Sequence, residues 1–125
     1  MSKKILIVDD EPHIRILLEQ TLEDLEDQGV ELLLAADGDE GLELALNECP
    51  DLIFLDVMMP QLSGYEVCQR VKAAESEIYV VLLTAKGQAI DKERGKEVGA
   101  DEYVTKPFDP DYVVERAAAV LGLDF

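Results

Sequence analysis

Five polar residues stand directly after short apolar segments of the chain: Asp9, Asp10, Asp56, Thr84 and Lys106. If these segments are strands of one parallel sheet, their carboxyl ends share an edge and the three carboxylates converge. Two carboxylates ~4 Å apart repel each other by about 4 kcal/mol at an effective dielectric constant of about 20. Such a cluster must be protonated, kept apart or neutralised by a cation. Because the ligands are few and all oxygen, the cation they favour is Mg²⁺.

The same residue types support transfer of a phosphoryl group to a carboxylate. A carboxylate can attack phosphorus and form an aspartyl phosphate. Because both partners are negatively charged, the reaction needs neutralisation, which Mg²⁺ and a lysine can provide. A threonine hydroxyl can donate a hydrogen bond to a phosphoryl oxygen. Taken singly, Asp9 or Asp10 could be a helix N-cap, Thr84 a turn residue and Lys106 a surface cation. Their joint occurrence at four segment ends favours a site.

Apolar and amphipathic segments alternate along the whole chain, which predicts the elements that must position these residues. The predicted strands are Lys4–Val8, 30–36, 52–55, 78–83 and 102–105. The predicted helices cover 12–28, 39–49, a segment starting at Ser63, 88–98 and about 110–121. Three of the strands are continuously apolar, as expected when both faces of a parallel sheet are covered. The pattern predicts an α/β fold with a doubly wound five-stranded parallel sheet and five helices.

Local signals define several helix ends and buried faces. Ser63 and Glu66 have capping-box spacing, and Asp109 before Pro110 is a typical helix start. The predicted buried positions are Ile14, Leu17, Leu18, Leu22, Leu25, Leu42, Ala45, Leu46, Cys49, Val67, Val71, Ala74, Val114, Ala117, Ala118 and Leu121. The helix over 88–98 has few apolar anchors, chiefly Ile90 and Val98, and is interrupted by Gly95, so we expect it to be the least firmly packed.

Size, charge and cysteine content exclude several functional classes. The chain has 125 residues, 48% of them apolar, which suits one domain with no output domain. Its longest apolar run, 78–83, is far shorter than the roughly 20 residues that cross a bilayer. A formal net charge of −17 disfavours direct contact with nucleic acids and anionic membranes. Cys49 and Cys68 lack metal or redox spacing, so we interpret both as reduced, small apolar residues of a cytoplasmic protein.

In order and spacing, four motifs resemble those of the receiver domain of bacterial response regulators. They are Ile-Val-Asp-Asp-Glu at 7–11, Leu-Asp-Val-Met-Met-Pro at 55–60 with Gly64 beyond, Leu-Thr-Ala at 83–85, and Gly-Ala-Asp-Glu-Tyr-Val-Thr-Lys-Pro-Phe at 99–108. The resemblance covers essentially the whole chain. It implies a flavodoxin-like strand order 2-1-3-4-5 and a place in a two-component phosphorelay.

The resemblance also implies a role for each site residue. Asp56 is the phospho-acceptor, and Lys106 pairs with the phosphoryl group. Asp10 binds Mg²⁺ directly, Asp9 acts mostly through a bound water, and Asp56 and the backbone carbonyl of Met58 complete the protein ligands. None of the acidic, hydroxyl or lysine positions departs from the family pattern.

Further implications concern switching and partners. Thr84 and Tyr103 form the switch pair, in which the hydroxyl moves to the phosphate and the ring turns inward, and the Lys106–Pro107 peptide is cis. A sensor histidine kinase or histidine phosphotransfer protein supplies the phosphoryl group. A downstream protein target reads the face formed by residues 88–98, 102–105 and the last helix. The protein catalyses only its own phosphorylation and dephosphorylation.

Three other classes compete with this interpretation. A Mg²⁺-dependent phosphatase with an aspartyl nucleophile usually has an acid/base aspartate two residues after that nucleophile, where this chain has Met58. A flavin-binding domain would need a hydroxyl-rich phosphate loop in place of Asp9-Asp10-Glu11-Pro12, and the chain has no G-x-G-x-x-G or P-loop spacing. A receiver used only for docking usually lacks one of the site residues, and none is missing from this chain.

Overall fold

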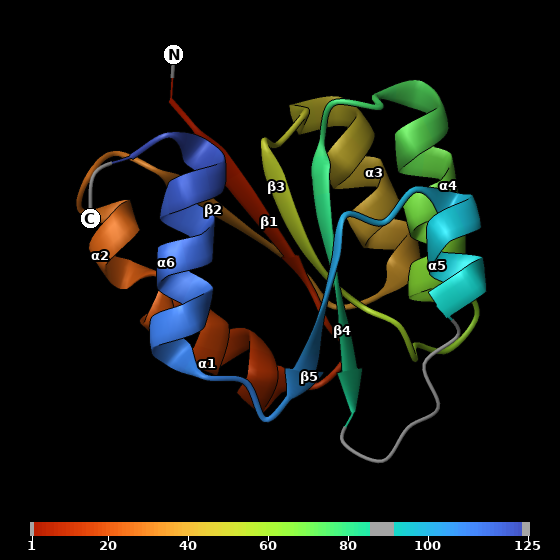
Figure 1. Ribbon diagram of the computed structural model, residues 1–125, viewed down its shortest axis with the longest axis horizontal. Helices are drawn as coiled ribbons and strands as arrows, with labels where there is room; N and C mark the ends of the chain where they lie inside the picture. Colours follow the sequence, from red (N-terminus) through yellow and green to blue (C-terminus); the bar gives the residue numbers. More distant parts are fainter. Residues whose placement is uncertain (1, 86–91, 124–125) are drawn as a thin grey trace.

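The computed structural model describes residues 2–85 and 92–123 and contains one five-stranded sheet. Its strands are β1 (Lys4–Val8), β2 (Glu31–Ala35), β3 (Leu52–Asp56), β4 (Tyr79–Ala85) and β5 (Glu102–Lys106). They lie in the order β2-β1-β3-β4-β5 and all pair in parallel. Their carboxyl ends therefore share one edge of the sheet, at the bottom in Figure 1.

Helices cover both faces of this sheet. The described residues form α1 (Pro12–Thr21), α2 (Glu23–Glu26), α3 (Gly38–Glu48), α4 (Gly64–Ala74), α5 (Lys92–Val98) and α6 (Pro110–Leu121). Figure 1 shows α1, α2 and α6 on one side of the sheet and α3, α4 and α5 on the other. The doubly wound fold and its strand order 2-1-3-4-5 are confirmed. The helix expected over 12–28 is divided at Leu22, so the described residues form six helices where five were predicted.

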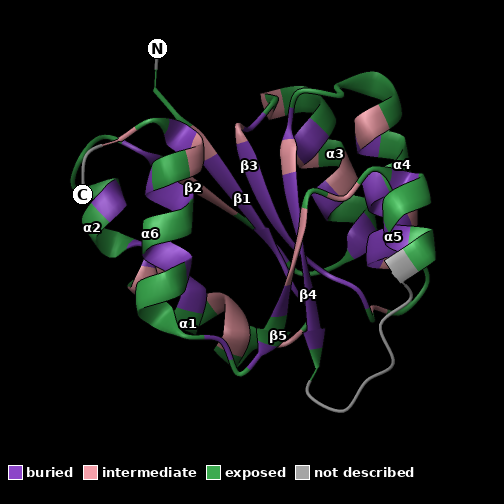
Figure 2. Cartoon of the chain, viewed as in Figure 1, coloured by how far each residue is buried: buried purple, intermediate pink, exposed green. Residues whose placement is uncertain are grey.

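Each face of the sheet has its own hydrophobic core, because neighbouring strand residues point to opposite faces. In β1, Ile5 and Ile7 belong to the core under α1, α2 and α6, whereas Leu6 and Val8 belong to the core under α3, α4 and α5. These four side chains have no exposed surface. Figure 2 shows the central strands almost entirely buried, as their continuous apolar sequences predicted.

The helix starts agree with the local sequence signals. Ser63 accepts a hydrogen bond from the Glu66 backbone N–H, and the Glu66 side chain accepts one from the Ser63 N–H, which completes the capping box. Asp109 caps α6 by accepting from the Asp111 N–H, and Pro110 occupies the first turn. These caps satisfy N–H groups that have no partner within a helix.

Four positions predicted to be buried are exposed. Leu17 and Leu46 are 41% and 43% exposed, because each lies at the edge of its helix's apolar face, beside the fully buried Leu18 and Ala45. Cys49 is the left-handed C-cap of α3, with φ of 47°, and so lies beyond the helical face to which the periodicity assigned it. Ala74 is the last residue of α4 and is exposed.

Helix α5 also differs from its sequence-based description. Ile90, expected to anchor it, lies outside the described residues, whereas the other anchor, Val98, is 7% exposed. The helix continues through Gly95 without the expected interruption. None of the described helices is long and apolar enough to cross a membrane.

Candidate functional site

The acidic residues after β1 and β3 meet at the carboxyl edge of the sheet. Asp9, Asp10, Glu11 and Asp56 each offer a carboxylate oxygen, and these oxygens all lie within 4.8 Å of one another. Because β1 and β3 are neighbours, with Val8 in register with Leu55, the residues that follow them emerge side by side. Asp9 and Asp56 are buried at 0% and 3% exposure, Glu11 is half-buried, and Asp10 is exposed.

Lys106, the last residue of β5, reaches this acidic cluster. Its Nζ lies 3.2 Å from Asp9 Oδ2, 3.2 Å from Glu11 Oε1 and 3.5 Å from Asp56 Oδ1. The residue is 8% exposed, so the ammonium group is almost wholly removed from bulk water. The Lys106–Pro107 peptide bond is cis. The cluster thus contains a buried cation among four acidic residues.

Backbone contacts hold the two buried carboxylates in place. The Glu11 N–H donates to Asp9 Oδ1 at 2.9 Å, and Arg15 Nη1 donates to the Asp9 carbonyl oxygen at 2.6 Å. The Met58 N–H donates to Asp56 Oδ1 at 3.3 Å. The two backbone N–H groups thus orient the Asp9 and Asp56 carboxylates, and the Arg15 contact anchors the Asp9 main chain.

Burial and mutual repulsion shift the pKa values of these groups. Removal from water, reinforced by the negative charge of Asp9, raises the pKa of Asp56 to about 7. Burial likewise raises the pKa of Asp9, although Lys106 opposes the effect. Burial alone would lower the pKa of Lys106, but the charges of Asp56 and Asp9 outweigh it and raise that pKa. A raised carboxyl pKa beside a lysine marks a functional-site candidate.

Thr84 brings a hydroxyl group to the same edge of the sheet. It is 1% exposed, and its Oγ1 has no hydrogen-bond partner among the described residues. A buried polar atom without a partner lowers stability, so such an atom needs an explanation. A phosphoryl oxygen accepting from this hydroxyl would provide one.

The donor set fits a hard divalent cation. The side-chain ligand atoms of the described cluster are carboxylate oxygens, which Mg²⁺ prefers, and a cation would oppose the burial and the repulsion from Asp9 that together raise the pKa of Asp56. Asp10, exposed at the rim, and the buried Asp56 both contribute a carboxylate oxygen to this cluster. The side chain of Met58 is 65% exposed and contributes no ligand, while the role of its backbone carbonyl stays a prediction.

Two residues of the site were not recognised from sequence. Glu11 is the last residue of the Ile-Val-Asp-Asp-Glu motif at 7–11 and had no predicted role, although its carboxylate binds Lys106. Arg15 was not considered, although it donates to the Asp9 carbonyl oxygen. The only signal for either was proximity to Asp9 in the chain: Glu11 follows Asp9 by two residues and Arg15 follows it by six. Tyr103 lies outside the acidic cluster, on the α5 side of β5.

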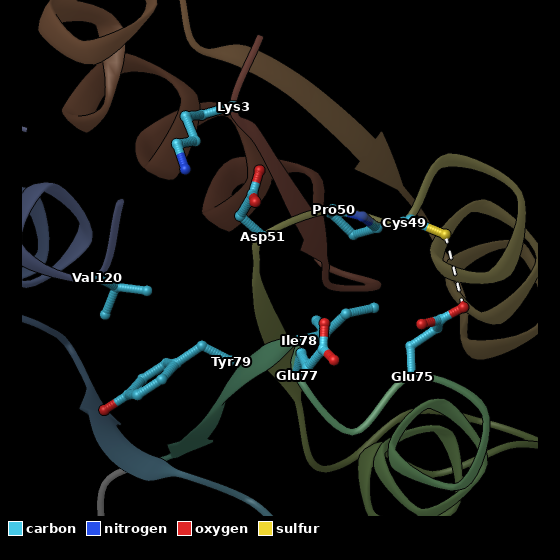
Figure 3. A pocket seen from close by; sticks show the side chains of 9 residues that line it. All are labelled: Lys3, Cys49, Pro50, Asp51, Glu75, Glu77, Ile78, Tyr79 and Val120. Carbon is cyan, nitrogen blue, oxygen red and sulfur yellow. Dashed lines mark hydrogen bonds between the residues drawn. The ribbon is translucent and has the colours of Figure 1, made fainter. Parts of the chain in front are cut away.

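A pocket lies at the amino-terminal edge of the sheet, opposite the edge that carries the acidic cluster. Figure 3 shows a pocket at the amino ends of β3 and β4, lined by residues that include Lys3, Asp51, Glu77 and Tyr79. The exposed Cys49 thiol lies beside this pocket, 4.0 Å from Glu75 Oε1. Because strands run from this edge to the other, the pocket is separated from Asp56 by the length of the sheet.

Comparison with known proteins defines the class of protein. The family model of the response regulator receiver domain matches residues 5–118. The chain therefore belongs to the response regulator receiver domain family.

Particular relatives agree with this assignment. The alkaline phosphatase synthesis transcriptional regulatory protein PhoP of Bacillus subtilis (strain 168) is 47% identical over 121 residues, covering 97% of this chain and 49% of PhoP. The probable transcriptional regulator ycf27 of Cyanophora paradoxa is 48% identical over 120 residues, covering 96% of this chain and 48% of its own length. The chain spans about half the length of the curated relatives it matches.

Solved structures show the same fold. Chemotaxis protein CheY4 of Vibrio cholerae superposes with a TM-score of 0.82 at 34% identity, covering 96% of this chain and 99% of CheY4. The BeF3-activated DrrB receiver domain superposes with a TM-score of 0.82 at 35% identity, covering 98% of this chain and 99% of DrrB's.

Proposed function

We propose that this chain is the phospho-acceptor of a two-component phosphorelay, with Asp56 as the acceptor and Mg²⁺ bound beside it. The observation that carries the proposal is the position of the buried Asp56 carboxylate, 3.5 Å from the buried Lys106 ammonium group. The same sheet edge carries the Thr84 hydroxyl, which has no hydrogen-bond partner in the described part of the chain. A nucleophile, a cation and a hydrogen-bond donor are thus available to one phosphoryl group.

Phosphoryl transfer follows from these positions. An oxygen of Asp56 forms a bond to phosphorus while the bond from phosphorus to a histidine nitrogen of the donor breaks, and that nitrogen keeps the electron pair. Lys106 pairs with the transferred group, and the Thr84 hydroxyl donates to one of its oxygens. Asp9, Asp10, Asp56 and the Met58 carbonyl would hold Mg²⁺, whose bound charge neutralises the phosphoryl oxygens.

The phosphoryl group then acts as a switch. It adds about two negative charges, and it draws Thr84 toward itself while the Tyr103 ring turns inward. The face that a partner reads consists of α5, β5 and α6. This face carries both charge signs: Arg94 of α5 lies over the Tyr65 ring at 5.0 Å, and Arg116 of α6 binds Glu102 of β5 at 2.7 Å.

The partners follow from the family and from charge. A sensor histidine kinase or a histidine phosphotransfer protein supplies the phosphoryl group, and a downstream protein target binds the switch face. The relatives PhoP and ycf27 are named transcriptional regulators, which makes this chain comparable to the receiver half of such a protein. A net charge of −17 leaves DNA contact to other parts of such a protein, and we place the chain in the cytoplasm.

A Mg²⁺-dependent phosphatase is the second candidate, because it uses the same nucleophile and cation. It also needs an acid/base group near the leaving oxygen. The position two residues after Asp56 is Met58, which cannot transfer a proton. We therefore propose that the chain catalyses only its own phosphorylation and dephosphorylation.

The test uses acetyl phosphate and Mg²⁺ with mass measurement of the intact chain. We expect one added phosphoryl group on the unmodified chain, none on Asp56→Asn, and one on the control Asp24→Asn, which alters an exposed acid of α2. Labelling that persists in Asp56→Asn contradicts the assignment. Multiple turnovers of p-nitrophenyl phosphate would favour the phosphatase instead.

A further inference from the structure

Gly95 is an unusual residue for the middle of α5. The helix runs from Lys92 to Val98 and continues through Gly95 in helical conformation. Glycine is among the least favourable residues in a helix interior, because it loses most backbone freedom when ordered. Gly95 is also buried, so it is not simply a residue tolerated on a solvent-exposed helix face. A requirement for space at this position would explain the glycine.

The space at Gly95 is taken by Tyr103. A Cβ added at Gly95 would overlap the Tyr103 hydroxyl oxygen and would lie 2.6 Å from the ring carbon Cζ and 3.0 Å from Cε2. Distances below 3.0 Å force one group to move, so no residue larger than glycine fits while the ring lies here. The Tyr103 ring therefore packs directly against the backbone of α5 at Gly95, and we call this position of the ring its seat.

The Tyr103 ring lies on the same face of the sheet from which the Thr84 side chain projects. Tyr103 is in register with Leu82, whose side chain belongs to the core under α3, α4 and α5, and Tyr103 packs partly buried against that same core. Thr84 is two residues beyond Leu82, so its side chain leaves the same face of β4. The tyrosine ring and the threonine hydroxyl thus share one face of neighbouring strands.

We propose that Gly95 is a positioning residue for the switch, and that the absence of its side chain creates the inward seat of the Tyr103 ring beneath α5. This inference rests on the proposed function. In that mechanism phosphorylation draws Thr84 toward the phosphoryl group and favours the inward ring. A methyl group at residue 95 occupies the seat, so it opposes the inward position and, by linkage, weakens binding of the phosphoryl group or its mimic.

The test measures beryllofluoride binding to the whole chain in the presence of Mg²⁺, with NMR detection of amide and Tyr103 ring signals. For Gly95→Ala we expect an affinity about tenfold weaker than that of the unmodified chain, with displaced Tyr103 ring signals. In the Tyr103→Leu background, where the side chain ends short of the seat, Gly95→Ala should change the affinity by less than about twofold. Lys96→Ala, an exposed change in the same helix, should change neither readout.

The outcomes separate this inference from the proposed function. If the unmodified chain does not bind beryllofluoride, the proposed function fails. If it binds and Gly95→Ala binds equally well, or if the loss persists undiminished in the Tyr103→Leu background, the positioning role fails alone. The unmodified chain gives an independent check should the variant not fold. Its beryllofluoride-bound form must show nuclear Overhauser contacts between the Tyr103 ring and the Gly95 α-protons, and their absence overturns the inference.

Discussion

Lys106 and Asp9 form a buried ion pair between the ends of β5 and β1, with 3.2 Å between Nζ and Oδ2, although the two residues are 97 positions apart in the chain. Two strands, β3 and β4, lie between them in the sheet. The pair therefore spans the carboxyl edge of the sheet beside Asp56, the proposed phospho-acceptor. The lysine partly neutralises the acidic cluster and lies within reach of the group that Asp56 would carry.

Removal of this charge should destabilise the chain in a way that Mg²⁺ corrects. Lys106→Met keeps most of the side-chain volume but leaves Asp9 and Asp56 without their buried cation. At pH 8 and without divalent ions, we expect a loss of about 3 kcal/mol in the free energy of unfolding, measured by urea denaturation. Saturating Mg²⁺ should recover most of it, because a cation again neutralises the carboxylates.

Lys72→Met is the matched control for that experiment. Lys72 is also largely buried and pairs with Asp101 at 2.8 Å, on a different part of the fold. Its replacement should lower stability to an extent that Mg²⁺ leaves unchanged. Equal Mg²⁺ rescue of both variants would show that the ion acts elsewhere than at the acidic cluster.

The pKa of Asp56 predicts how stability depends on pH without divalent ions. Asp56 holds a proton up to about pH 7 in the folded chain, but only up to about pH 4 once unfolded. Because the folded state binds more protons between these values, the contribution of Asp56 to the free energy of unfolding is largest below about pH 4 and is lost as the pH rises toward 7. The raised pKa of Asp9 acts in the same direction.

Thermal melts of three proteins between pH 5 and 8 measure this effect. The unmodified chain should become less stable with rising pH, and Asp56→Asn should show a weaker dependence, because it carries no charge at either extreme. Mg²⁺ should stabilise the unmodified chain most at the high-pH end, since the ion binds the deprotonated carboxylate. Asp24→Asn should follow the unmodified chain. A pH profile that Asp56→Asn leaves unaltered would show that the burial of Asp56 does not control stability.

The strands and the polar residues that follow them could be predicted from sequence because each depends on local information. A continuously apolar run such as Leu52–Leu55 has few alternatives to a buried strand, and parallel strands place the residues after them at one edge. The side chain that Lys106 contacts could not be predicted in this way. Its bond to Glu11 joins residues 95 positions apart and depends on rotamers that only the assembled edge determines.

Helix faces and Gly95 show where local information is insufficient. Leu17 and Leu18 are the same residue type in the same helix, yet only Leu18 is fully buried, because the position of α1 on the sheet selects between them. Propensity predicted a break at Gly95, but the seat of Tyr103 provides a tertiary reason for a glycine within a continuous helix. Tertiary packing routinely overrides propensity in this manner.

The capping box of α4 should have a measurable and purely structural effect. Ser63→Ala removes the acceptor of the Glu66 N–H, for which we expect a loss of about 1 kcal/mol in the free energy of unfolding. Replacement of Ser63 by Asp or Thr should retain most of the stability, because both can accept the same bond. Urea denaturation of the three variants measures this. An alanine variant as stable as the unmodified chain would show that another group satisfies the Glu66 N–H.

Gly64, which follows that cap, connects fold stability to the position of Asp56, the proposed acceptor. Its N–H donates to the Val57 carbonyl oxygen at 2.9 Å, so the start of α4 lies directly on the backbone that follows Asp56. A Cβ at Gly64 would overlap the Asp56 carbonyl oxygen and lie 2.8 Å from Val57 Cα. Unlike a side chain, these backbone atoms cannot move without shifting Asp56 relative to Lys106.

Gly64→Ala should therefore impair phosphorylation more than its loss of stability explains. We expect a destabilisation of about 1–3 kcal/mol, as for other overpacked sites, and a rate of labelling by acetyl phosphate at least about tenfold lower under conditions where the variant remains folded. Ser63→Ala is the control, because it weakens the same helix start without adding an atom beside Asp56. If the two variants lose labelling rate in proportion to their stability, the contact between Gly64 and the backbone of Asp56 and Val57 has no separate role in placing Asp56.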